Sequence, residues 1–323
     1  FFIHKYFARR ITTNFRMSLL GFLAEKDENI AEKFYQKSEL RDDITILDPF
    51  MGGGTTIFEA LRFGCKVIGN DLQPLSLFVT KALVESVDEK SINIEISHLR
   101  KSVGEKIGNY YKTICPCCEG KADSMYVFHV KKVSTNSTCK EHRLFSSFVI
   151  AYKKEIFTVV CPKCGKIKKT RFENGSYICE CGWELKSPRD KYVKNGTFSC
   201  SECGETQILT DYGPETGYPF DTDIIAIEYY CPNCKSHDYK VPDEKDLLLF
   251  KKAKTDLKKL EEKLPIPKQL IPEGYNTNQI LNHGYKKFRE LFNDRQLLCL
   301  GLLLQAINDI KDENIQLWFQ LAF

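Results

Sequence analysis

The sequence predicts an α/β fold whose parallel sheet is interrupted by a β-rich, cysteine-rich insertion. An apolar run at 44–47 leads through a glycine-rich loop to helical periodicity at 56–63 and then to a second apolar run at 66–70. A strand–helix–strand succession of this kind builds a parallel sheet. Between residues 113 and 240 short β-rich runs alternate with pairs of cysteines, which indicates a separate inserted region.

Changes in composition divide the chain into four regions. They are an α/β part (1–112), the insertion (113–240), a charged helix with a proline-rich linker (241–274), and a helical return to the first part (275–323). The remaining expected elements are helices at 17–36 and 75–87 and strands at 147–152, 157–160 and 224–230. The stretch DRQLLCLGLLLQAI in the last region is too apolar for a solvated helix, so we expect it to pack onto the first region.

The length of the chain leaves room for more than one domain. It has 323 residues, 42% hydrophobic and 28% charged, with a formal charge of +4, which permits an anionic partner without requiring one. The apolar run Leu297–Leu303 is far short of the ~20 residues of a membrane span. We find no leader peptide and expect a cytoplasmic protein. Because the chain starts at Phe1 without a methionine and stops at Phe323 within a helical pattern, we expect a fragment.

The glycine-rich loop ILDPFMGGGTT is built to hold a ligand. Pro49 prevents the first strand from continuing, and Gly52–Gly54 allow left-handed backbone angles and close approach to the main chain. Thr55 or Thr56 can cap the next helix, whose N–H groups favour a negative group. Asp71 ends the second strand, where an acid in Rossmann-like folds accepts hydrogen bonds from ribose hydroxyls.

Three ligands compete for this loop, beside the alternative of a simple sharp turn. A dinucleotide loop requires G-x-G-x-x-G, and Ile57 stands where its last glycine belongs. A phosphate-binding P-loop requires a lysine after the glycines, and none is present. S-adenosylmethionine remains, with Asp48 near its cationic end. The residues expected to hold it are Asp48, Pro49, Phe50, Gly52, Gly53, Gly54, Thr55, Thr56, Asp71 and Leu72.

The cysteine pairs predict structural zinc sites. Two ligands separated by two residues on a tight turn can both reach one tetrahedral Zn²⁺ at ~2.3 Å. Pairing them in sequence order gives three closed sites: Cys115, Cys118, Cys139 and His142; Cys161, Cys164, Cys179 and Cys181; and Cys200, Cys203, Cys231 and Cys234. The first is the least defined, because Cys117 can replace Cys118. Four protein ligands leave no open position, so up to three zinc ions have a structural role.

Other uses of cysteine fit less well. Disulfides need an oxidising compartment, for which the sequence gives no indication, and an iron–sulfur centre also uses four cysteines. Cys65 and Cys299 lie in apolar surroundings and are expected in the core.

The loop resembles motif I of the amino-methyltransferases, Asp-Pro-Phe-x-Gly-x-Gly-Thr-Thr. The segment Gly69–Pro74 is similar to the second-strand segment of these enzymes, and His4–Arg10 to the segment that precedes their motif I. Together with the zinc ribbons, the chain resembles the zinc-ribbon-containing adenine-specific DNA methylases. The segments Ala226–Pro232 and Leu291–Leu297 also match this family. The resemblance implies a Rossmann-like S-adenosylmethionine-dependent methyltransferase sheet into which the ribbons are inserted.

The sequence departs from the family at its catalytic motif. Amino-methyltransferases use Asp/Asn-Pro-Pro-Tyr/Phe to hold the amine and stack the flipped base, yet none of the twelve prolines is adjacent to another. The resemblance places that motif beyond Phe323. We therefore expect no catalytic residue in this chain, which by itself methylates nothing. A C-terminal remainder or a second subunit is expected to supply the motif.

Three functions follow from these patterns. The first is the cofactor-binding portion of a DNA adenine-N6 methyltransferase, with DNA as partner. The alternatives are an RNA base methyltransferase of the tRNA guanine-N2 type and a non-catalytic zinc-ribbon subunit that binds nucleic acid. Arg295 and Gln296 are expected either to touch substrate or to lie on a helix surface. The candidate DNA contacts are Lys131, Lys132, Lys166, Lys168, Lys169 and Arg171. The alternative is that these residues only form a solvated charged face.

Overall fold

The structure is a computed structural model that divides the chain into two compact units. It describes residues 11–35, 41–134, 141–172, 175–194, 196–199, 206–208 and 222–323. The first unit comprises Phe1–Val103 and Leu303–Phe323, and the second comprises Gly104–Leu302. In the described parts of the chain no helix is long and apolar enough to cross a bilayer.

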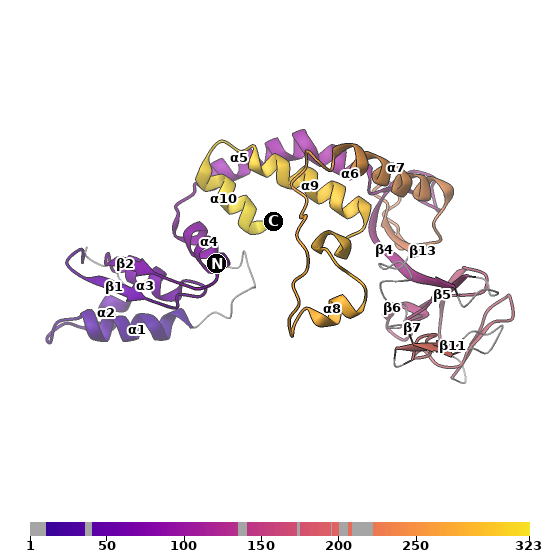
Figure 1. The fold of residues 1–323 in the computed structure, drawn as a ribbon, viewed down its shortest axis with the longest axis horizontal. Helices are drawn as coiled ribbons and strands as arrows, with labels where there is room; N and C mark the ends of the chain where they lie inside the picture. The colour runs from indigo at the N-terminus through magenta and orange to yellow at the C-terminus, as the bar shows by residue number, and fades with distance from the viewer. Residues whose placement is uncertain are drawn as a thin grey trace. The chain divides into compact units, whose positions relative to one another are not determined.

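The first unit contains the βαβ segment and the helices around it (Figure 1). Its elements are α1 (Thr12–Leu23), α2 (Ile30–Tyr35), β1 (Thr45–Asp48), α3 (Thr55–Arg62), β2 (Lys66–Gly69), α4 (Pro74–Val84), α5 (Glu89–Leu99) and α10 (Glu313–Ala322). The strands pair in parallel, with Thr45 opposite Lys66 and Asp48 opposite Gly69. The predicted strand–helix–strand unit is therefore confirmed, and the fold is mixed α/β.

The single helix expected at 17–36 is instead two helices. α1 ends at Leu23, and α2 begins after Asn29, whose side chain accepts the Ala31 N–H at 3.1 Å. A local side-chain bond of this type competes with helix continuation. α1 and α3 pack together in a core that includes Leu20, Ala60 and Cys65. The prediction that Cys65 is a core residue is confirmed.

The end of the chain returns to the first unit. Ile307, Ile310 and Ile315 form a buried cluster against which Val87 and Leu99 pack. The Asp312 carboxylate accepts the N–H groups of Asn314 and Ile315 and so caps α10. These contacts hold the last turns of the chain beside the segment that links α4 to α5.

The second unit is built around an antiparallel sheet with the order β14-β13-β4-β3, and β5 pairs with the far end of β4. Figure 1 shows β4 and β13 side by side within this unit. Its strands are β3 (Lys112–Ile114), β4 (Lys121–Ser134), β5 (Glu141–Leu144), β6 (Val149–Lys153), β7 (Ile156–Val160), β8 (Ile167–Thr170), β9 (Tyr177–Ile178), β10 (Glu184–Leu185), β11 (Thr197–Ser199), β12 (Thr206–Ile208), β13 (Thr222–Tyr230) and β14 (His237–Lys240). Its helical segments are α6 (Glu105–Asn109), α7 (Glu244–Leu260), α8 (Asn278–Asn282) and a 3₁₀ turn (Phe288–Leu291), and α9 (Asp294–Asn308) begins here.

The helices of the second unit enclose a separate core. Ala253 and Leu257 of α7 pack with Leu297, Leu298 and Cys299 of α9. The predicted charged helix is therefore amphipathic, with its alanine and leucine stripe buried and its lysines in solvent. The core placement predicted for Cys299 is confirmed. Sequence patterning did not predict the long strand β4, although that strand joins most of the sheet.

Candidate functional site

The glycine-rich loop is held in shape by two carboxylates. Asp48 Oδ1 accepts the Phe50 N–H at 3.1 Å and fixes the first turn of the loop. Asp71 reaches across from the end of β2: its Oδ2 accepts the Gly52 N–H at 2.8 Å and its Oδ1 accepts the Gln73 N–H at 2.9 Å. The N–H groups of Gln73 and Gly52 lower the pKa of Asp71. This carboxylate therefore binds the loop to the second strand and stays ionised.

The glycines leave the start of α3 open to a ligand. Gly54 is the N-cap residue, with a φ of 76° and no side-chain cap. Among the described residues, the N–H groups of Gly53, Thr55 and Thr56 have no hydrogen-bond partner. Unpaired N–H groups at a helix N-terminus attract a negative group. The expectation that Thr55 or Thr56 caps the helix is wrong, because both lie inside α3 after a left-handed Gly54.

Gly54 also lies directly against α4. A Cβ atom at this position would lie 2.7 Å from Thr80 Oγ1 and 2.8 Å from its Cγ2. Thr80 Oγ1 is itself buried and has no hydrogen-bond partner among the residues that the structure describes. Both the backbone angle and the available space therefore require glycine.

We expect Gly54→Ala to destabilise the protein by about 2 kcal/mol, because a left-handed backbone angle and a clash with Thr80 act together. The matched control is Gly21→Ala in α1, where a Cβ atom meets nothing within 4 Å and alanine favours the helix. Thermal unfolding followed by circular dichroism measures both variants. Equal melting temperatures would contradict the packing described for Gly54.

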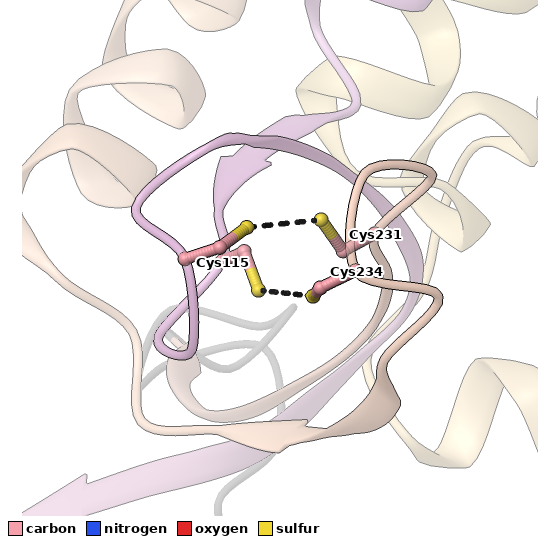
Figure 2. A group of neighbouring side chains, drawn as sticks. Cys115, Cys231 and Cys234 are labelled. Carbon is pink, nitrogen blue, oxygen red and sulfur yellow. Dashed lines mark hydrogen bonds between the residues drawn. The ribbon is translucent and has the colours of Figure 1, made fainter.

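Four cysteines from two distant hairpins meet in the second unit. The sulfur atoms of Cys115, Cys118, Cys231 and Cys234 all lie within 4.8 Å of one another. Cys115 Sγ is 3.6 Å from Cys234 Sγ, and Cys118 Sγ is 3.5 Å from Cys231 Sγ. Figure 2 shows the side chains converging from the two turns, with dashed lines at these two contacts. We call this set the outer cysteine group.

Strand pairing explains the outer group and corrects the predicted pairing. Cys115 begins the turn between β3 and β4, Cys231 begins the turn between β13 and β14, and β4 and β13 are neighbours in the sheet. The two hairpins therefore place their turns at the same end of the sheet. Pairing in sequence order, which joined Cys115 to Cys139 and Cys231 to Cys200, is wrong for these two turns because the intervening ribbon is inserted between β4 and β13.

A second set, the inner cysteine group, follows the predicted pairing. Cys161, Cys164, Cys179 and Cys181 have their sulfur atoms within 4.8 Å of one another. Gly165 closes the first turn with a φ of 73°, as its glycine predicts. In the outer group Glu119 and Lys235 adopt positive φ at the equivalent place, each with a φ of 56°. Three of the turns therefore share one backbone shape although only one has the glycine.

The thiols of the outer group influence one another's ionisation. Burial acts to raise the pKa of Cys115, but the N–H groups of Cys118 and Cys117 outweigh it and lower this pKa to about 6. The Ser236 N–H acts to lower the pKa of Cys234, yet burial and the neighbouring thiols raise it to about 12. Thiols packed this closely cannot all ionise unless a cation lies among them. A tetrahedral set of four thiolates suits Zn²⁺.

The structure resolves one predicted ambiguity. Cys117 is not part of the outer group: its Sγ lies 3.8 Å from Tyr229 Oη and 3.7 Å from Ser236 Oγ. Cys118 is therefore the residue that joins Cys115. Of the other predicted ligands, Cys139, Cys200 and Cys203 lie outside the described residues. His142 lies on β5, with its ring 6.1 Å from that of Phe198 on β11.

A buried ion cluster, which the sequence patterns did not reveal, supports the outer group. Lys240 Nζ lies 2.9 Å from Asp246 Oδ2 and 2.6 Å from Asp243 Oδ2, and it donates to Thr113 Oγ1 at 3.0 Å. Asp246 is 3% exposed. The cluster fastens the start of α7 to β3 and β14, the strands beside the cysteine turns. Asp243 and Asp246 also form a capping box at the start of α7.

Two predicted contact residues have structural positions instead. The Arg295 guanidinium is buried between the rings of Tyr111 and Phe250, with its Cζ 4.2 and 4.1 Å from their centres. Its Nη1 donates to the Tyr110 carbonyl at 3.2 Å. Gln296 exchanges hydrogen bonds with Asn293 at the start of α9. Both predicted alternatives, substrate contact and a helix-surface position, are therefore wrong for Arg295, which is 7% exposed. It joins α9 to α7 through its cation–π contact with Phe250.

Several of the candidate DNA-binding lysines are already paired within the protein. Lys166 forms an ion pair with Glu180, and Lys169 forms one with Asp238, both at 2.7 Å. Lys132 is 3.0 Å from Glu141. Lys168 and Arg171 are exposed. The β8 region therefore offers less free positive charge than its sequence indicates.

Comparison with known proteins finds similarity to methyltransferases in each case. Residues 28–161 match the model of the D12 class N6 adenine-specific DNA methyltransferases, a segment that includes the glycine-rich loop and Asp71. The type II methyltransferase M.MvaI of Kocuria varians is 36% identical over 67 residues, which are 21% of this chain and 15% of that protein. The type II methyltransferase M.MjaII of Methanocaldococcus jannaschii is 23% identical over 170 residues, 50% of this chain and 26% of that protein.

The chain thus spans about a quarter or less of the length of these relatives. No solved structure matches it. The family match includes the loop whose motif predicted this resemblance, and both relatives are methyltransferases by name. The predicted resemblance is confirmed at this level: residues 28–161 of the chain are similar to the D12 class N6 adenine-specific DNA methyltransferases.

Proposed function

We propose that this chain is the S-adenosylmethionine-binding portion of a DNA adenine-N6 methyltransferase, with a Rossmann-like sheet and inserted zinc ribbons. The observation that carries the proposal is the glycine-rich loop, fixed by Asp71 and open at the start of α3, within the segment that matches the family. A DNA rather than an RNA substrate is favoured because the matching family acts on DNA.

The residues at the loop fit the proposed cofactor. The free N–H groups of Gly53, Thr55 and Thr56 suit its carboxylate, and the carboxylate of Asp71 has lone pairs left for ribose hydroxyls. Phe50, in the loop, and Leu72, just after Asp71, are 85% and 98% exposed and offer apolar surface to a ligand. The cofactor supplies the methyl group, and this chain's own residues bind and orient it.

Calorimetric titration with S-adenosylhomocysteine tests the cofactor site. We expect Asp71→Ala to weaken binding at least about tenfold, because it removes a charged hydrogen-bond acceptor and releases the loop from β2. Asp71→Asn keeps one acceptor oxygen, so its affinity for S-adenosylhomocysteine is expected to lie between that of the unaltered chain and that of Asp71→Ala. Asp42→Ala removes an exposed charge from the same unit and serves as the control. Undiminished binding by Asp71→Ala, or no binding by the unaltered chain, would refute the assignment.

We further propose that zinc occupies the cysteine groups as a structural ion. Each group offers four sulfur ligands and no open position, the arrangement of structural rather than catalytic zinc. Cys139, His142, Cys200 and Cys203 keep their predicted role as ligands, and we propose that they bind a third ion. Metal analysis then gives about three zinc ions per chain, whereas His142→Ala gives about two. We keep the cytoplasmic location in this proposal because a reducing compartment leaves thiols free for metal.

We propose that the residues that complete methyl transfer are supplied by another segment or subunit, since the sequence has no adjacent prolines. This chain alone is then inactive on DNA. Supplying the complete protein with DNA and with tRNA separates the proposal from the RNA alternative. Methylation of tRNA alone would favour the guanine-N2 type, and binding without methylation of either would favour the non-catalytic subunit.

A further inference from the structure

A cavity of about 650 Å³ lies in the ribbon part of the second unit, on residues that the proposed function does not use. Its walls come from β10, β11 and residues between them, from Trp183 just before β10, and from Phe148 of the loop before β6. Volumes of 300–1,000 Å³ are typical of small-molecule and nucleotide sites. The cavity is therefore large enough for one or two nucleotides.

Aromatic side chains form one wall of the cavity. Phe148 is buried, and Trp183 and Tyr192 contact its ring edge-on, with centres 5.0 and 5.8 Å away. Trp183 and Tyr192 are themselves only partly buried and line the cavity. Both rings are thus packed against the buried Phe148 while part of each stays exposed at the cavity, as a stacking platform requires.

Free positive charge surrounds the same cavity. Lys186, Lys191 and Lys194 line it and are exposed. Among the described residues none of the three has an ion-pair partner, in contrast to Lys166 and Lys169 on β8. The acids Glu184 and Asp190 also line the cavity, so the rim has a modest excess of positive charge that suits one or two phosphates.

We infer that this cavity binds an unpaired nucleotide of a DNA strand, with the base on Trp183 and Tyr192 and the phosphates among the three lysines. Aromatic rings beside lysines are typical of sites that bind single-stranded nucleic acid. Each base can stack on an aromatic ring, and each phosphate carries a negative charge that a lysine can pair with. The inference rests on the proposed DNA partner and assigns the contact to the part of the ribbon around β10 and β11 rather than to β8. It places DNA recognition and cofactor binding on separate units of the chain.

Tryptophan fluorescence tests the stacking contact, because Trp183 and Trp318 are the two tryptophans of the chain. The full chain is titrated with a single-stranded oligodeoxynucleotide. We expect quenching that persists in Trp318→Phe, disappears in Trp183→Phe, and is accompanied there by about tenfold weaker binding. Quenching that persists in Trp183→Phe, unchanged affinity of that variant, or tighter binding of the matching oligoribonucleotide would overturn the inference.

A charge comparison tests the lysines. Replacing Lys186, Lys191 and Lys194 with glutamine is expected to reduce the slope of log affinity against log salt concentration by about 0.7 for each lost phosphate contact. The matched control replaces Lys251, Lys254 and Lys258, three exposed lysines of α7. An equal reduction in the control would show general charge attraction and overturn the inference.

The cofactor assay keeps the two proposals apart. Trp183→Phe is expected to bind S-adenosylhomocysteine as the unaltered chain does, since Trp183 lies in the other unit. Cofactor binding without DNA binding by the unaltered chain refutes the cavity inference alone. DNA-dependent quenching at Trp183 without cofactor binding supports the cavity and refutes the proposed function.

Discussion

With zinc in the outer cysteine group, as we propose, Cys231→Ser is expected to remove one ion and to unfold the end of the sheet formed by β3, β4, β13 and β14. Structural zinc in small ribbons contributes roughly 10–16 kcal/mol of binding free energy, and serine is a poor ligand for it. Because Cys231 shares its group with Cys115 and Cys118, loss of the ion also releases the turn between β3 and β4. Metal analysis and circular dichroism measure the two effects.

The double variant Cys115→Ser, Cys231→Ser distinguishes two pairings of the cysteine turns, the shared outer group and the pairing in sequence order. With one shared ion it loses no more zinc than either single variant, whereas pairing in sequence order would cost two ions. Cys117→Ser is the matched control, because Cys117 lies in the same turn but contacts Tyr229 and Ser236 instead. A loss of two ions by the double variant, or of one by Cys117→Ser, would contradict the outer group.

Lys240→Met is expected to lower the free energy of unfolding by about 3–5 kcal/mol, because it leaves the carboxylate of Asp246 buried without its cation. Asp246 is 3% exposed and Lys240 is 8% exposed, so water cannot replace the lost contact. The cluster also includes the capping box of α7, and we expect that helix to detach from β3 and β14. Urea unfolding followed by circular dichroism gives the change in free energy.

Lys268→Met is the control for this prediction. Lys268 lies 2.6 Å from Glu262, but the two side chains are 63% and 79% exposed, and exposed pairs of this kind are worth less than about 1 kcal/mol. A change for Lys240→Met as small as that for the control would show that the buried cluster does not stabilise the unit.

Local patterns predicted the parts of the site that depend on neighbouring residues. The βαβ unit follows from two apolar runs separated by a glycine-rich loop, and the parallel pairing of β1 with β2 confirms it. The turn shape at Cys161 follows from Gly165, whereas Glu119 and Lys235 also adopt a positive φ without a glycine signal. The break between α1 and α2 was not predicted, because it depends on local side-chain hydrogen bonds: Glu28 accepts the Glu25 N–H and Asn29 accepts the Ala31 N–H.

By itself the sequence determined the glycine-rich loop, the acid at the end of β2 and the cysteine turns, since each depends on residues close together in the chain. Which cysteine turns share a group depends on long-range pairing: the contact from Cys115 to Cys234 spans 119 residues and follows from the pairing of β4 with β13. In the same way, Arg295 is buried, and Lys166 and Lys169 form ion pairs with Glu180 and Asp238. Burial and ion pairing depend on partners distant in sequence, which spacing alone cannot identify.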